Sequence, residues 1–167
     1  MAELSIVPEC YVDTKVAEIV GQARKYNHQH GCGDVANQLK NRLKDKPALG
    51  IIDEDKNKGP VPKYFSEFEQ IKQENDLILK KHKEKKQYLI LVCPEIENWL
   101  QKNATTVNLN LPANLYNLKQ ITKRQDIDNN IEFYRFIKDL IKKEAPGIIT
   151  LKNWIESFNK NELPLKQ

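Results

Sequence analysis

The sequence predicts an α/β domain with a mostly parallel central sheet flanked by helices. Short apolar runs alternate along the chain with segments of helical spacing, which is the pattern of a layered α/β domain. Residues 48–52 form a continuous apolar run, as expected of a strand buried on both faces of a parallel sheet. With 167 residues, of which 40% are hydrophobic, the chain can build one substantial core.

The segment before this run predicts a strand and two helices. Residues 4–7 are a short apolar run ended by a proline, which is typical of a strand. Apolar residues then recur at helical spacing and predict a helix over residues 13–26, with Asp13 or Thr14 as its N-cap. A second helix is predicted over residues 35–46, after a segment that contains two glycines.

The middle of the chain predicts further strands. Residues 64–71 are rich in aromatic side chains and predict a short helix or turn. Residues 76–79 and 87–93 are apolar runs joined by a lysine-rich connection, which favours two strands and an exposed hairpin, although a helix through the lysines is an alternative.

The C-terminal part is predicted to be mainly helical. A proline opens a helix over residues 94–103, and the polar segment 103–117 is predicted to be a loop. Helical spacing returns over residues 131–141 and, after a Pro-Gly break, over residues 151–158.

The chain is predicted to be one domain, with an α/β core over residues 1–110 and a helical segment over residues 111–167 packed on the same domain. It has no run of about 18 apolar residues and no signal-peptide pattern, so we expect a cytoplasmic protein with free thiols and no membrane association. The net charge of +4 permits a nucleic-acid partner, although the lysines of residues 80–86 equally suit a solvated turn.

Acidic side chains follow two of the predicted strands. Asp53 and Asp55 come after the continuous apolar run, and Glu9 comes after the first strand. Ligands bind at the carboxyl ends of strands in such sheets, and carboxylates are preferred by Mg²⁺ and Mn²⁺. The spacing is therefore compatible with a Mg²⁺ (or Mn²⁺) site. By itself, however, it favours the other interpretation, in which the two aspartates cap the next turn or pair with Lys56 and Lys58.

The segments around these acids resemble the motifs of the TOPRIM-like family of metal-dependent nucleic-acid enzymes. PECYVDTKVAEIV resembles the first motif, in which a glutamate, here Glu9, follows a hydrophobic strand, with Asp13 four residues on. GIIDEDK is similar to the second motif, an apolar strand that runs into Asp-x-Asp, here Asp53 and Asp55.

Two further segments resemble small TOPRIM-like proteins related to overcoming-lysogenization-defect nucleases. LILVCPEIENWL is similar to their strand and acidic helix start and points to Glu97, with Glu95 as the alternative, and APGIITLKNWI resembles their closing segment. The resemblance covers roughly the whole chain and implies a TOPRIM-like layered fold. One departure is Cys10, where the family usually has glycine. Because glycine lets a phosphate approach the backbone closely, a catalytically inactive descendant that binds nucleic acid or a partner ATPase is the alternative.

The resemblance implies a Mg²⁺-dependent phosphodiesterase, a nuclease of DNA or RNA that acts in bacterial phage defence or DNA maintenance and is accompanied by a separate ATPase. It makes Glu9 a general base or acid near the scissile phosphate, with Asp13 beside it. It implies as metal ligands Asp53, Asp55 and Glu97. Lys56 is placed to neutralise a phosphate oxygen, or else to pair with the neighbouring aspartates.

His28, His30 and Cys32 form an H-x-H-x-C pattern. A structural zinc site needs four ligands, usually in paired spacings, and no fourth ligand is placed here. The pattern instead predicts a loop at the start of a helix, with His28 or His30 near a bound nucleic acid. The chain contains no phosphate-binding P-loop, dinucleotide-binding or serine-hydrolase motif, which removes the usual support for those activities.

Overall fold

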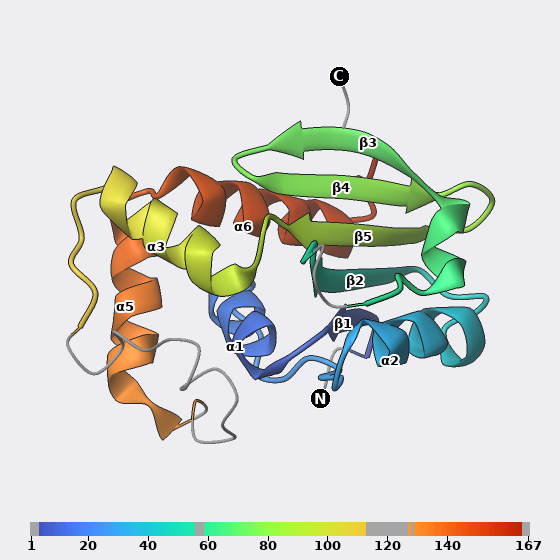
Figure 1. Cartoon of the computed structure of the whole chain (residues 1–167), viewed down its shortest axis with the longest axis horizontal. Coiled ribbons are helices and arrows are strands. Elements are labelled where there is room, and N and C mark those ends of the chain that lie inside the picture. Colours follow the sequence, from blue (N-terminus) through green and yellow to red (C-terminus); the bar gives the residue numbers. More distant parts are fainter. Residues whose placement is uncertain (1–3, 56–58, 113–126, 128, 165–167) are drawn as a thin grey trace.

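A five-stranded mixed sheet lies at the centre of the molecule (Figure 1). The structure is a computed structural model that describes residues 4–55, 59–112, 127 and 129–164. The strand order is β1-β2-β5-β4-β3. The strands are β1 (Ile6–Pro8), β2 (Ala48–Asp53), β3 (Phe68–Glu74), β4 (Leu77–His82) and β5 (Gln87–Val92).

Half of the strand pairings are parallel. β1 pairs with β2 and β2 with β5 in parallel, whereas β4 pairs with both β5 and β3 in the antiparallel sense. The α/β prediction is confirmed, and the predicted parallel arrangement holds for β1, β2 and β5. The other edge is antiparallel because short turns join β3, β4 and β5, and a parallel connection needs a crossover of a dozen or more residues.

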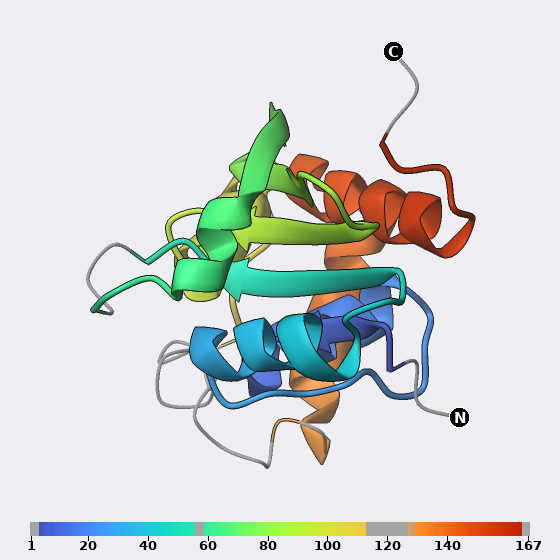
Figure 2. The ribbon, with the colours of Figure 1, turned by 90° about the vertical axis from the view of Figure 1, so that its right-hand side faces the viewer.

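Helices cover both faces of the sheet. They are α1 (Tyr11–Val20), α2 (Cys32–Asn37), the π-helix η1 (Gln38–Arg42), the 3₁₀-helix η2 (Lys63–Glu67), α3 (Ile96–Thr106), α5 (Ile131–Lys142) and α6 (Pro146–Asn159). In Figure 2, α6 (red) and η2 (green) lie on opposite sides of the strands. No helix in the described part of the chain has the length and apolarity needed to cross a membrane.

β2 contributes to a separate hydrophobic core on each face. Leu49 and Ile51 pack into the larger core, which also receives buried side chains of α1, α3, α5 and α6. Ala48 and Ile52 pack into the smaller core beneath α2, η1 and η2. This double burial explains the continuous apolar run in the sequence. Gly50 lies in the middle of the same strand, and a Cβ there would lie 2.7 Å from the Leu89 side chain. The glycine therefore allows close packing at this position.

The strand β3 is the main element that the sequence analysis missed. Residues 64–71, predicted as a short helix or turn, form η2 and then enter β3. Apart from Phe68, the side chains of β3 are exposed, so this edge strand lacks the apolar alternation by which a half-buried strand is recognised. Several helix boundaries also differ. The helix predicted over residues 13–26 spans Tyr11–Val20 and ends at its C-cap, Gly21. α3 begins at Ile96, two residues after the proline predicted to open it, and extends to Thr106, into the predicted loop; α6 begins at Pro146, because proline is tolerated in a first helical turn.

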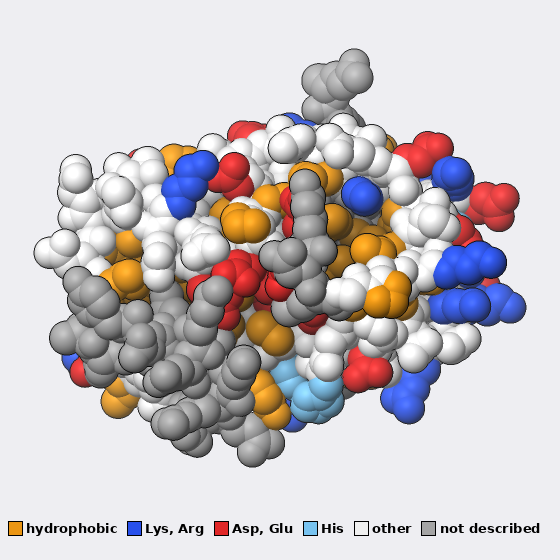
Figure 3. Space-filling view, viewed as in Figure 1, with side chains coloured by type: hydrophobic (Ala, Val, Ile, Leu, Met, Phe, Trp, Pro, Cys, Tyr) orange, Lys and Arg blue, Asp and Glu red, His pale blue; other side chains and the backbone are white. Residues whose placement is uncertain are grey.

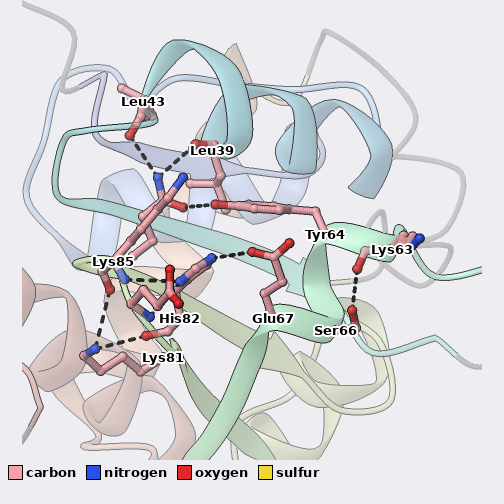
Figure 4. Close-up of polar contacts among 11 residues, drawn as sticks. Leu39, Leu43, Lys63, Tyr64, Ser66, Glu67, Lys81, His82 and Lys85 are labelled. Atoms are coloured by element: carbon pink, nitrogen blue, oxygen red, sulfur yellow. Dashed lines mark hydrogen bonds and ion pairs between the residues drawn. The ribbon is translucent and has the colours of Figure 1, made fainter.

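A buried glutamine fixes η1 and η2 against the sheet (Figure 4). The Gln87 side chain is 0% exposed and its amide donates to the carbonyls of Leu39 and Leu43, each at 2.8 Å. Its carbonyl oxygen accepts the Tyr64 hydroxyl at 2.6 Å. The polar network thus joins η1, η2 and β5, and holds η2 in place at one side of the site described next.

Candidate metal centre

Three carboxylates from separate elements meet at the carboxyl end of the parallel strands. Glu9 directly follows β1, Asp53 ends β2, and Asp13 lies in the first turn of α1. One oxygen of each side chain lies within 4.8 Å of the others, which is close enough for one metal ion to bind all three. Figure 3 shows acidic side chains gathered near the middle of this face.

Backbone hydrogen bonds hold two of the three carboxylates. The N–H of Asp53 donates to Glu9 Oε2 at 2.8 Å, and the N–H of Ile96 donates to Asp53 Oδ1 at 2.9 Å. Ile96 is the first residue of α3, so the Asp53 carboxylate also lies at the positive end of that helix dipole. The strand end and the helix start therefore set the positions of Glu9 and Asp53.

Asp13 is the most deeply buried member of the group, with 1% of its surface exposed. Its Oδ2 accepts a hydrogen bond from the Cys10 thiol at 2.8 Å, whereas its Oδ1 is buried without a hydrogen-bond partner among the described residues. Desolvation by burial raises the pKa of Asp13 well above that of an ordinary carboxyl group, and the negative charges of Asp53, Glu9 and Glu97 raise it further. A bound cation would offset both effects.

Cys10 contacts the carboxylate group directly. Burial, followed by the negative charge of Asp13, raises the pKa of the Cys10 thiol, so the thiol stays neutral and donates to the carboxylate. The side chain of Cys10 is thus a hydrogen-bond donor to Asp13.

Asp55 and Glu97 lie next to the three-carboxylate group but outside it. The Asp55 backbone N–H donates to the Pro94 carbonyl at 3.0 Å, and its side chain lines the same pocket as Glu9 and Asp53. Glu97 lies in the first turn of α3, near enough for its charge to raise the pKa of Asp13. The structure therefore brings Asp13, rather than Asp55, together with Asp53.

The remaining predicted site residues have different surroundings. Glu95, the alternative to Glu97, is the N-cap residue of α3 and its carboxylate accepts the Asn98 amide at 3.0 Å. Lys56 and Lys58 lie outside the described residues.

The two histidines lie on a segment that runs beside β1. The N–H groups of Asn27, Gln29 and Gly31 donate to the carbonyls of Ile6, Pro8 and Glu9. The last of these bonds brings the segment to the backbone of Glu9. Gly31 has φ +140°, a backbone conformation that side chains with a Cβ rarely adopt.

The histidine rings pack against the start of α1. The His28 ring stacks on Tyr11 with centroids 4.3 Å apart, and its Nδ1 lies 2.9 Å from the Thr14 hydroxyl. His30 meets His28 edge to face at 4.9 Å and is exposed. Figure 3 shows histidine side chains on the same face as the acidic group.

A pocket of about 310 Å³ opens beside the carboxylates on the α2 side of the sheet. Glu9 and Asp53 line one part of it, and Ile52, Leu89 and Phe65 line another. This pocket is not evident in the sequence. Its apolar side chains come from β2, β5 and η2, and in the sequence they look the same as ordinary core residues.

The described site thus combines a carboxylate group able to bind a hard cation with an adjoining, mainly apolar pocket. No protein-family model, curated protein or solved structure gives a significant match to this chain.

Proposed function

We propose that this protein is a Mg²⁺- or Mn²⁺-dependent nuclease that hydrolyses phosphodiester bonds of DNA or RNA, with Glu9, Asp13 and Asp53 around the metal. The observation that carries the proposal is the meeting of three carboxylates around a buried Asp13 oxygen that has no hydrogen-bond partner in the described part of the chain. Burying several negative charges together is costly unless a cation compensates them. The resemblance of the surrounding motifs to TOPRIM-like enzymes supports the same assignment.

The chemistry of the group favours a hard cation. All three ligand atoms are carboxylate oxygens, which suit Mg²⁺ and Mn²⁺, whereas soft metals prefer thiolate. Cys10 is adjacent, but its raised pKa keeps it a neutral thiol that donates to Asp13. The Cys10 sulfur is not among the atoms that lie close enough to share one ion, so the ligand set in the described residues consists of oxygens.

Each acid has a role in this proposal. When bound, a divalent ion neutralises charge on the phosphate and lowers the pKa of a coordinated water. Asp13 and Asp53 would hold the ion, and Glu9, as in the TOPRIM-like motif, would accept or return the proton near the scissile phosphate. Asp55 and Glu97, which lie next to the group, would accept hydrogen bonds from water in the site.

The test combines metal binding with cleavage. Mg²⁺ or Mn²⁺ should raise the melting temperature of the wild type and of Asp45→Asn, an exposed acid outside the group, but not of Asp13→Asn. Labelled single-stranded and duplex DNA and RNA should be cut by the wild type and by Asp45→Asn. Cleavage should fall about 100-fold or more in Asp13→Asn and Glu9→Gln. Cleavage that survives both substitutions would refute the site assignment.

A second candidate is a TOPRIM-like module that binds metal and nucleic acid or a partner ATPase without turnover. The observation that favours it is Cys10, whose side chain occupies the position where the family has glycine. A metal-dependent rise in melting temperature without cleavage of any of the four substrates would select this candidate. Restoration of cleavage in Cys10→Gly would then identify the cysteine as the cause.

A further inference from the structure

The pocket beside the carboxylates has one acidic end and an apolar floor. Ile52 and Leu89, both buried, and the half-buried Leu91 come from the adjacent strands β2 and β5. Phe65 of η2 lines the same pocket, and Val61, which is 71% exposed, lies at its rim. Figure 3 shows hydrophobic side chains gathered beside the acidic group on the same face.

The size and composition of this pocket suit one flat, mainly apolar group. Its volume of about 310 Å³ is at the lower end of the range of small-molecule pockets, which is roughly 300–1,000 Å³. Its apolar part, which Phe65 and strand side chains of β2 and β5 supply, resembles the usual surroundings of a buried ring system. The Gln87 network fixes the wall that η2 supplies, so the pocket is formed before a ligand arrives (Figure 4).

The charged side chains that line the pocket indicate which chemical group is joined to the flat ring of the ligand. Lys63 and Lys80 also line the pocket and supply positive charge. The acids that line it are Glu9, Asp53, Glu54 and Asp55, of which Glu9 and Asp53 also belong to the carboxylate group, so an anionic ligand needs the proposed metal ion to offset their charge. A ligand in the pocket therefore lies next to the proposed metal ion and two lysines. A base joined to phosphates has this combination of a flat ring system and flanking negative charge.

We infer that the pocket binds one unpaired nucleobase of a single strand, with its flanking phosphate at the carboxylate group. The inference rests on the proposed function and makes single-stranded nucleic acid its substrate class. A base in a duplex is stacked and paired, so flipping it out to enter such a pocket costs free energy. Single strands, loops and frayed ends avoid this cost.

The experiment measures whether one base contributes to binding through this pocket. Two labelled eight-nucleotide strands are compared by fluorescence anisotropy in Ca²⁺, which binds oxygen ligands. One strand is fully abasic, and the other carries a single thymine at its centre. The wild type is compared with Leu91→Trp and Ser66→Trp, which fill the pocket from β5 and η2, and with Ile71→Trp on the exposed strand β3.

The wild type and Ile71→Trp should bind the one-base strand about tenfold more tightly than the abasic strand. Leu91→Trp and Ser66→Trp should bind both strands equally, because the base then has no pocket to enter. Equal binding of the two strands by the wild type would overturn the inference, as would an undiminished preference for the base in Ser66→Trp, an exposed position where folding is not at risk.

The outcome is separable from that of the proposed nuclease activity. A base preference that depends on the pocket, without cleavage of any strand in Mg²⁺ or Mn²⁺, would leave the base pocket standing and refute the nuclease. Cleavage by the wild type without any base preference would support the nuclease and refute the base pocket.

Discussion

The backbone N–H of Asp53 donates a 2.8 Å hydrogen bond to the carboxylate of Glu9, a residue 44 positions away in the sequence. The bond exists because β1 and β2 are parallel neighbours, so that their carboxyl ends lie side by side. Through this bond the backbone of Asp53, itself part of the proposed metal centre, orients the carboxylate of Glu9. The centre is therefore a property of the sheet rather than of either sequence motif alone.

Asp13 should make the metal-free protein less stable as the pH rises. Its pKa is raised in the folded state, so above the ordinary carboxyl pKa the unfolded chain has lost a proton that the folded protein still holds. The free energy of unfolding therefore falls as the pH increases through this window. Asp13→Asn removes this dependence, and its melting temperature in chelator should exceed that of the wild type by a margin that grows between about pH 4 and pH 8. A constant margin would contradict the assignment.

The thiol of Cys10 should support metal binding through Asp13. Its hydrogen bond favours the ionised carboxylate, which is the form that binds metal. In Cys10→Ala the pKa of Asp13 rises further, so Mn²⁺ affinity should fall more at about pH 6 than at about pH 8. Isothermal titration at both values measures this difference. Cys93→Ala, which removes another half-buried thiol, is the matched control and should bind Mn²⁺ like the wild type.

Loss of the buried Gln87 amide should destabilise the fold strongly. Gln87→Leu leaves the carbonyls of Leu39 and Leu43 and the Tyr64 hydroxyl without their partner. We expect a loss of about 2–4 kcal/mol in the free energy of unfolding, measured with urea. Gln73→Ala on the exposed strand β3 should change it by less than about 0.5 kcal/mol. A similar small effect in Gln87→Leu would show that the network adds no stability.

Gly147 should not tolerate a side chain, because α6 packs closely on α3 there. A Cβ at this position would lie 2.6 Å from the Asn103 side chain and 2.8 Å from Trp99. Asn103 also accepts the Gly147 N–H at 2.7 Å. Gly147→Ala should therefore cost about 1–3 kcal/mol. Gly33→Ala is the control: apart from its chain neighbours and its own helix backbone, no atom of the described residues lies within 4 Å of its added Cβ, and urea unfolding should show little change or a slight gain.

Asp13 shows where prediction from sequence reached its limit. The sequence analysis predicted the helix to begin at residue 13, with Asp13 or Thr14 as its cap, whereas α1 begins at Tyr11 directly after the strand. Asp13 therefore lies inside the first turn and contacts Cys10. The resemblance to TOPRIM-like motifs had already singled out Asp13, but local spacing alone did not distinguish a capping residue from a site residue.

The amino-acid sequence by itself determined the elements whose signals are local: the doubly buried strand β2, the hairpin of β4 and β5, and acids at the ends of two strands. Tertiary structure alone decided the exposed edge strand β3, the grouping of Asp13 with Glu9 and Asp53, and the pocket between η2 and β5. The physical reason is the distance along the chain over which each signal acts. Hydrophobic periodicity and proline act within a few residues, whereas a site of this kind depends on which distant strand ends and helix starts are packed together.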